Sequence, residues 1–258
     1  MRRAVIGALA LLALAAVGCA RLPWLGRRRA AEPFRAYIVH HSPQGFREIA
    51  ALFEEETGIR VDLIFPRRSG LYEVVSKNRD GDLVVSSQRS VLDQLEKDGL
   101  GTAPFLPIGE LVPVIEVAKG NPKGIWTLAD LAREDVRVAL AAEPGGMGTV
   151  ARSILERNRL AERVERRVVA RPRSDDKAAA SVDGQKVDAT LMWLWAVREV
   201  GDRVEAVPIP PGQNVIEPIE AMVLNAGTNR AAAERFAAYL RCPQARGILH
   251  RVGLLTQQ

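Results

Sequence analysis

The sequence predicts an α/β protein with largely parallel sheets. Short apolar runs suited to buried strands alternate along the chain with longer runs in which apolar residues recur at helical spacing. This alternation is typical of α/β folds, in which helices cover the faces of a mostly parallel sheet. The 258 residues are enough for one large domain or for two lobes.

The first half of the chain shows the pattern clearly. Ser42 and Pro43 predict a helix start, because serine caps helices and proline fits their first turn. Ile49 and Phe53 then fall on one helical face, and Gly58 ends the helix. We expect strands at 34–39, 59–65 and 83–85, and helices at 43–57, from 69 onward, and at 87–97.

The second half continues the alternation. Residues 106–119 form a long extended segment interrupted by Pro107 and Pro113, and this segment is a candidate crossover between lobes. Thr127 and Asp130 have the spacing of a capping box, which predicts a short helix. We expect further strands at 136–142, 167–170, 188–195, 204–209 and 217–225, and helices at 150–158, 175–182, 229–241 and 243–252.

Residues 1–18 have the layout of a signal peptide. Arg2 and Arg3 precede an apolar run over residues 4–17, which is shorter than the roughly 20 residues that a helix needs to cross a bilayer. The small residues at 16–18 stand directly before Cys19, and this motif resembles the bacterial lipobox, in which the cysteine becomes lipidated. The alternative is an ordinary secretory signal with an incidental cysteine.

The segment 19–32 has no apolar periodicity and is predicted to be a tether. Its consecutive arginines at 27–29 can contact anionic headgroups or can simply be solvated. Removal of residues 1–18 lowers the formal net charge from +5 to +3, and charges of both signs are interspersed elsewhere. We therefore expect no nucleic-acid partner, but a monomer held at a membrane outside the cytoplasm.

Cysteine usage favours neither a disulfide nor a metal site. If Cys19 carries lipid, Cys242 has no partner within the chain. The place of Cys242 between a helical run and Pro243 favours a half-buried packing role. No cluster of cysteine and histidine has zinc-site spacing, so we expect neither a cofactor nor a resident metal.

Candidate binding residues lie where strands end and helices begin. In open α/β sheets ligands bind beyond the carboxyl ends of strands, where helix N-termini offer backbone N–H groups and a favourable dipole to an anion. Ser42, Ser69 and the glycine-rich turn at 145–149 occupy such positions. Each serine alone can be a plain helix cap, but the convergence of three helix starts favours binding.

Several motifs resemble those of periplasmic molybdate-binding proteins. They are Phe53–Gly58 (FEEETG), Ser69–Gly70, Asp82–Ser87, Gly124–Leu131 (GIWTLADL), Val136–Pro144, Asp188–Ala189 and Ala245–Gly253. The resemblance covers roughly residues 34–255 and implies the type II periplasmic-binding fold, with a ligand enclosed between two lobes. It also implies lobe one at 33–112 and 217–258, and lobe two at 113–216.

The resemblance further implies the residues that hold the ligand. In these proteins an oxyanion is bound by two serines, by backbone groups of the second lobe and by a tyrosine. Ser42 and Ser69 match the serines, Ala141 and Asp176 fall near the backbone contacts, and Trp193 falls where the tyrosine is expected. The leading expectation is a non-enzymatic, lipid-anchored receptor for a molybdate- or tungstate-like oxyanion, with an ABC permease as its partner.

Three other functions stay open. A transition-metal receptor would use His40 or His41, of which strand alternation places one outward, with Asp175 or Asp176 as oxygen ligands. A sensor lipoprotein would keep the fold without transport. An enzyme with Ser42 as nucleophile and His41 as base is disfavoured, because adjacent strand residues face opposite sides and no G-x-S-x-G motif is present.

Overall fold

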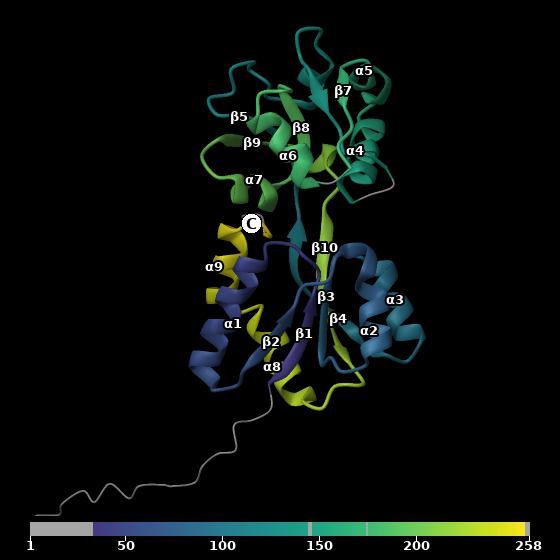
Figure 1. Ribbon diagram of the computed structural model, residues 1–258, viewed down its shortest axis with the longest axis vertical. Coiled ribbons are helices and arrows are strands. Elements are labelled where there is room, and N and C mark those ends of the chain that lie inside the picture. Colours follow the sequence, from purple (N-terminus) through teal and green to yellow (C-terminus); the bar gives the residue numbers. More distant parts are fainter. Residues whose placement is uncertain (1–32, 144–145, 174, 256–258) are drawn as a thin grey trace, which may run out of the picture. The chain divides into compact units, whose positions relative to one another are not determined.

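The computed structural model describes residues 33–143, 146–173 and 175–255. The predicted signal peptide, tether and Cys19 lie outside these residues, and so do Pro144 and Gly145 of the glycine-rich turn. The described chain forms two mixed sheets, each flanked by helices (Figure 1). This arrangement confirms the predicted α/β class.

The first sheet gathers strands from both ends of the described chain. They are β1 (Phe34–Ile38), β2 (Val61–Ile64), β3 (Leu83–Ser86), β4 (Gly101–Leu111) and β10 (Glu217–Leu224). Their order is β2-β1-β3-β10-β4. β1 is parallel to β2 and β3, whereas β10 is antiparallel to β3 and β4.

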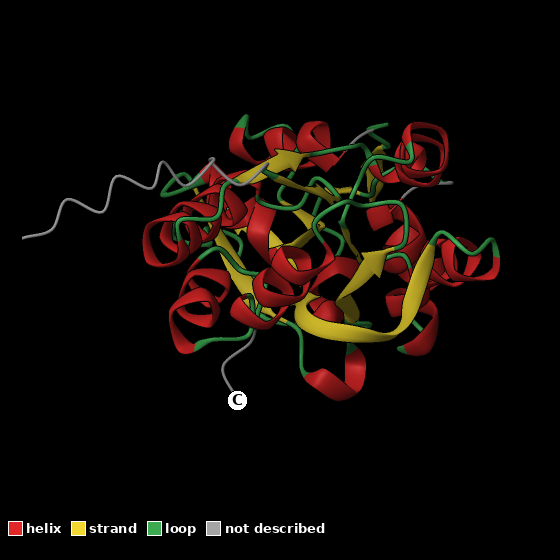
Figure 2. Ribbon diagram, turned by 90° about the horizontal axis from the view of Figure 1, so that it is seen from below, coloured by secondary structure: helices red, strands yellow, loops and turns green. Residues whose placement is uncertain are grey.

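Helices cover both faces of this sheet (Figure 2). They include α1 (Pro43–Thr57), α2 (Leu71–Asn78), α3 (Arg89–Lys97), α8 (Arg230–Tyr239) and α9 (Pro243–Arg251). Alternation along β1 assigns them to faces, because successive side chains of a strand point to opposite sides. Phe34 packs with Phe53 of α1 and Phe236 of α8. Tyr37 instead packs in the cluster that contains apolar residues of α2 and α3.

The second sheet has a matching layout. Its strands are β5 (Pro113–Ala118), β6 (Val138–Ala139), β7 (Val168–Ala170), β8 (Ala189–Trp193) and β9 (Val204–Pro208). The order is β7-β6-β8-β5-β9, with β6 parallel to its neighbours and β5 antiparallel to β8 and β9. Its helices are α4 (Gly146–Arg157), α5 (Ala161–Glu165), α6 (Asp175–Asp183) and α7 (Leu194–Val200).

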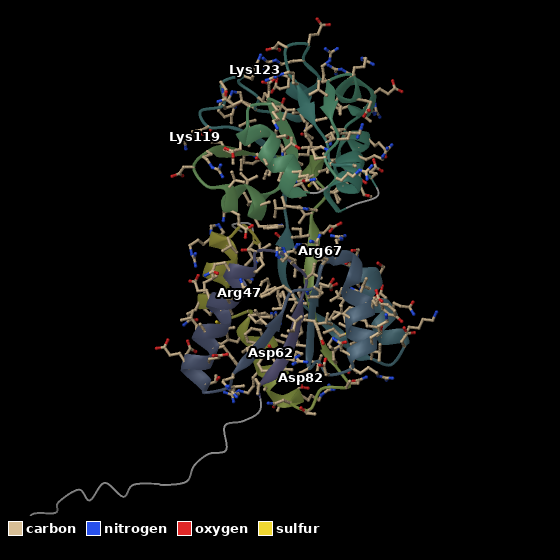
Figure 3. All side chains as sticks on the ribbon, viewed as in Figure 1. Arg47, Asp62, Arg67, Asp82, Lys119 and Lys123 are labelled. Carbon is tan, nitrogen blue, oxygen red and sulfur yellow. The ribbon has the colours of Figure 1, made fainter. Side chains whose placement is uncertain are left out.

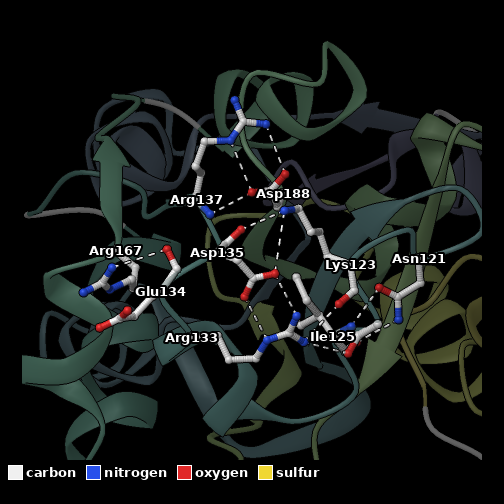
Figure 4. Close-up of polar contacts among 10 residues, drawn as sticks. Asn121, Lys123, Ile125, Arg133, Glu134, Asp135, Arg137, Arg167 and Asp188 are labelled. Carbon is white, nitrogen blue, oxygen red and sulfur yellow. Dashed lines mark hydrogen bonds and ion pairs between the residues drawn. The ribbon is translucent and has the colours of Figure 1, made fainter.

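Side-chain hydrogen bonds fix the long loop between β5 and β6 (Figure 4). Asn121 exchanges two hydrogen bonds of 2.9 Å with the backbone of Ile125. Arg137 pairs with Asp188 at 3.1 Å, which ties the residue before β6 to the residue before β8. These contacts hold the short strand β6 in register although it has only two residues.

Each sheet is mixed, whereas the prediction was mostly parallel sheets. β10 and β5 run antiparallel to their neighbours, and each enters its sheet directly from the other sheet. A helical crossover within one sheet favours parallel pairing, but these strands have no such crossover before them. The predicted extended segment 106–119 is in fact β4 and β5, separated by Val112. The lobe boundaries placed at 112/113 and 216/217 stay a prediction.

Three other elements differ in extent or type from those expected. The helix predicted from Val150 begins at Gly146, and the strand predicted to Trp195 ends at Trp193, so Trp195 lies in α7. The helix after Thr127 is a 3₁₀ helix, η2 (Leu128–Ala132). Its predicted capping interaction is confirmed, because the Thr127 N–H donates to Asp130 Oδ2 at 2.8 Å.

Candidate functional site

A cavity of about 870 Å³ lies between loops at one end of the first sheet and the start of α4. One wall is formed by His40, Phe65, Arg67, Arg68, Ser69, Gln88 and Glu217, and the other by Gly146, Thr149 and Val150. The residues come from segments far apart in the sequence, and strands that end at the same edge bring them together. The cavity is therefore the candidate binding site.

The first wall is built around a 3₁₀ turn, η1 (Arg68–Gly70). Arg68 is half-buried, and its Nη1 donates to Glu217 Oε2 at 3.0 Å and to Ser87 Oγ at 3.2 Å. Arg67, labelled in Figure 3, is an exposed side chain. It forms no ion pair with any described residue. Ser69 is exposed, so its hydroxyl is accessible from the cavity.

The charge of this wall favours an anion. Two guanidinium groups, those of Arg67 and Arg68, line this wall together with one carboxylate, that of Glu217. The ion pair with Glu217 holds Arg68 in place, and the charge of Arg67 stays uncompensated. Because guanidinium groups present a planar fork of N–H donors, they match the oxygens of carboxylates and oxyanions.

The opposite wall is the first turn of α4. The N–H groups at a helix start lack partners within the helix, and the dipole there favours negative charge. Gly148 allows this turn to approach the segment after β6. A Cβ at Gly148 would lie 2.7 Å from the carbonyl oxygen of Ala141 and 2.6 Å from that of Ala142. The cavity thus has donors on both walls.

Ser42 occupies the N-cap position of α1 in an unusual conformation. Its backbone is left-handed, with φ 46° and ψ 65°, and its side chain makes no capping hydrogen bond. The Gly45 N–H donates instead to the Ser42 carbonyl oxygen at 3.0 Å. The helix start is confirmed, but side-chain capping by Ser42 is wrong. Its side chain is buried and does not line the cavity, so its binding role stays a prediction.

Of the other predicted binding residues, Ser69 is the one among the described lining residues of the cavity. Ala141 is buried just after β6, and Trp193, the last residue of β8, is packed in the core. Asp176 lies in α6, and its side chain is outside the described part of the structure. The binding roles of all four stay predictions.

The two histidines differ in environment as predicted, although both lie in the bend after β1 rather than in a strand, so strand alternation is not the cause. His40 is exposed and lines the cavity, whereas His41 is buried. Burial, together with the positive charges of Arg68 and His40, lowers the pKa of His41 to about 3. His41 is therefore neutral at pH 7. Within the described residues, no group of three or more His, Cys, Asp or Glu side chains is arranged to hold a metal ion.

Several residues of the cavity wall were not assigned from the sequence. Arg67 and Arg68 carried a usable signal, since two consecutive arginines directly before a predicted helix start indicate an anion site. Gln88 and Glu217 carried no such signal, because only the fold brings them to the cavity wall. Cys242 behaves as predicted: it is half-buried, and its Sγ accepts from the Ala245 N–H at the start of α9, at 3.5 Å.

A family model described as bacterial extracellular solute-binding protein matches residues 44–255. The match includes the whole second sheet, the first sheet except β1, and the whole cavity wall except His40. The chain belongs to this family. Solute-binding proteins of this family are not enzymes as a class, and their setting is extracytoplasmic. In the described part of the chain, no helix is long and apolar enough to span a membrane.

The relatives of this solute-binding protein confirm the resemblance to molybdate-binding proteins. The molybdate-binding protein ModA of Mycobacterium tuberculosis is 25% identical over 209 residues, which cover 81% of this chain and 78% of that protein. A substrate-binding domain from Clostridium difficile superposes with a TM-score of 0.79 at 14% identity, over 88% of this chain and 99% of that one. The Azotobacter vinelandii periplasmic molybdate-binding protein gives 0.68 at 16% identity, over 87% and 100%.

Proposed function

We propose that this solute-binding protein captures a small oxyanion of the molybdate or tungstate type in the cavity beside Arg67, Arg68 and Ser69, and delivers it to the permease of an ABC importer. The cationic wall of the cavity carries the proposal. An anion there meets two guanidinium groups, a serine hydroxyl and the N-terminus of α4. The 25% identity to a protein named for molybdate binding supports the same ligand class.

The site of action follows from the N-terminal sequence. Residues 16–18 and Cys19 resemble a lipobox, and a multiply acylated cysteine holds a protein stably on a membrane. We propose a monomeric receptor anchored through Cys19 outside the cytoplasm, with no nucleic-acid partner. Incorporation of labelled palmitate that is lost in Cys19→Ala tests this part.

Isothermal titration of the full chain in detergent with molybdate, tungstate, sulfate and phosphate tests the ligand proposal. We expect selective binding of one or more of these anions. Arg67→Ala and Ser69→Ala should each weaken binding about tenfold, because a hydrogen bond to a charged group contributes about 1.5–3 kcal/mol. Arg163→Ala and Ser90→Ala are matched controls, since both residues are exposed on helices outside the cavity wall.

Two results would contradict the proposal. Either no anion of the panel binds, or the Arg67 and Ser69 variants bind as tightly as the wild type. A ligand-induced rise in melting temperature gives an independent readout, because ligand at about 100 times its Kd adds roughly 2.7 kcal/mol of stability.

A further inference from the structure

A pair of buried rings is linked to the cavity wall through Ser87 and Arg68, and neither ring belongs to the residues predicted to bind the oxyanion. His41 follows β1, and Trp195 lies in the first turn of α7. Their ring centroids are 5.9 Å apart with an interplanar angle of 55°. His41 is 7% exposed and Trp195 is 6% exposed. The pair therefore joins elements attached to the two different sheets.

A chain of hydrogen bonds connects His41 to the cavity. Ser87 Oγ lies 3.2 Å from Arg68 Nη1 and 3.3 Å from His41 Nε2. Arginine can only donate, so Ser87 Oγ accepts from Arg68. His41 Nε2 is the acceptor that the described residues offer to the Ser87 hydroxyl proton. We therefore assign the proton of neutral His41 to Nδ1.

This assignment leaves two buried N–H donors without acceptors, on rings whose centroids are 5.9 Å apart. His41 Nδ1 and Trp195 Nε1 are both fully buried and have no hydrogen-bond partner among the described residues. Buried polar groups in native proteins nearly always have a partner, because an unpaired one carries the full cost of its desolvation. Two orphaned donors, one of them on a ring linked through Ser87 to a guanidinium, favour an acceptor that bears negative charge.

We propose that His41 Nδ1 and Trp195 Nε1 form a donor-only subsite that receives one oxygen of the bound anion behind Arg68. The subsite rests on the proposed function and deepens it. Because it offers donors and no acceptor, it selects fully deprotonated oxygens over hydroxyl groups. It also disfavours cations, since the Nε2 lone pair of His41 is already engaged by Ser87.

The direct readout is the indole N–H resonance of Trp195 in ¹H–¹⁵N spectra of the full chain in detergent. Addition of molybdate, sulfate or phosphate should move this resonance downfield, because a hydrogen bond to an anion deshields the proton. The resonance of Trp126, which is 65% exposed, should stay in place. Trp195→Phe and Trp126→Phe assign the two signals.

Affinity measurements give the second readout. Trp195→Phe keeps an aromatic ring but removes the donor, and it should weaken binding of the anion about tenfold or more. His41→Phe should do the same, whereas His41→Asn, whose amide can donate near the position of Nδ1, should retain most of the affinity. Trp126→Phe should bind as the wild type does.

The outcomes separate the two proposals. If an anion binds but the Trp195 resonance does not move, and both Trp195→Phe and His41→Phe keep the wild-type Kd, the subsite is overturned while the proposed function stands. If no anion of the panel binds, both are overturned. The resonance shift is measured on the unaltered chain, and correlation of each indole N–H with its own backbone amide identifies the signals without a variant, so the shift decides the matter even where a variant fails to fold.

Discussion

Glu116 lies in the middle of β5, opposite Thr190 of β8 and Ala206 of β9, and it has no exposed surface. Both of its carboxyl oxygens lack hydrogen-bond partners among the described residues. Burial, with a smaller effect from the charge of Asp183, raises the pKa of Glu116 to about 8. The native protein therefore holds this carboxyl protonated at neutral pH.

The raised pKa of Glu116 predicts a specific pH dependence of stability. Between its ordinary pKa of 4.5 and about 8, the folded state retains a proton that the unfolded state has lost. The contribution of Glu116 to the free energy of unfolding is thus fully present below pH 4.5. It decreases as the pH rises to about 8, by up to about 1.4 kcal/mol per pH unit. Glu116→Gln cannot ionise, so its free energy of unfolding should rise relative to wild type over that range.

Urea unfolding of both proteins at pH 5, 7 and 9 measures the effect. Glu96→Gln, at an exposed position of α3, is the matched control and should show a constant difference from wild type. If the curves for Glu116→Gln and wild type run parallel from pH 5 to pH 9, Glu116 is not held protonated by the fold.

At the residue scale, the sequence predicted an anion site more readily than it predicted the individual residues of that site. Ser69 lies on the cavity wall in the 3₁₀ turn just before α2, and such local positions can be predicted from sequence. Trp193 and Trp195 could not be told apart in this way. The strand ends at Trp193, so a boundary two residues earlier than expected turns Trp195, rather than Trp193, toward His41.

The elements themselves followed from their apolar periodicity. Long amphipathic segments such as α1 and α8 were predicted closely, because many residues contribute to each pattern. Short elements such as β6 were not, since two residues carry no period and contacts such as Arg137–Asp188 hold the strand. The antiparallel direction of β5 and β10 arises because the chain enters each strand from the other sheet. A local sequence pattern does not predict this direction.

Packing of α8 on β1 and α1 depends on an aromatic cluster. The ring of Phe236 lies 5.3 Å from that of Phe34 and 5.1 Å from that of Phe53, and its side chain is fully buried. Phe236→Ala should lower the free energy of unfolding by about 3–5 kcal/mol, because it removes buried surface and leaves a cavity.

Phe105→Ala is the matched control for Phe236→Ala. Phe105 is half-buried, with the Arg89 guanidinium 4.5 Å above its ring, so its truncation removes less packed surface. Urea unfolding should show the smaller loss for Phe105→Ala. Equal losses at the two positions would mean that the cluster does not hold α8 to the sheet.

At the scale of the whole described chain, the site depends on how the chain passes between the two sheets. The chain crosses from β4 to β5 through Val112 and returns from β9 to β10, so residues before and after the second sheet meet in the first. Glu217, the first residue of β10, thereby reaches Arg68 on the cavity wall. The resemblance of short motifs predicted this two-sheet plan, whereas pairs such as Glu217 with Arg68 emerge only in the folded chain.

The most direct test of anion capture is a crystal structure grown with tungstate and measured at a wavelength where tungsten scatters anomalously. We expect one strong anomalous peak in the cavity, within hydrogen-bonding reach of Arg68, Ser69 and the first turn of α4. A peak elsewhere on the chain, or no peak with tungstate in large excess, would contradict the assignment of this cavity as an oxyanion site.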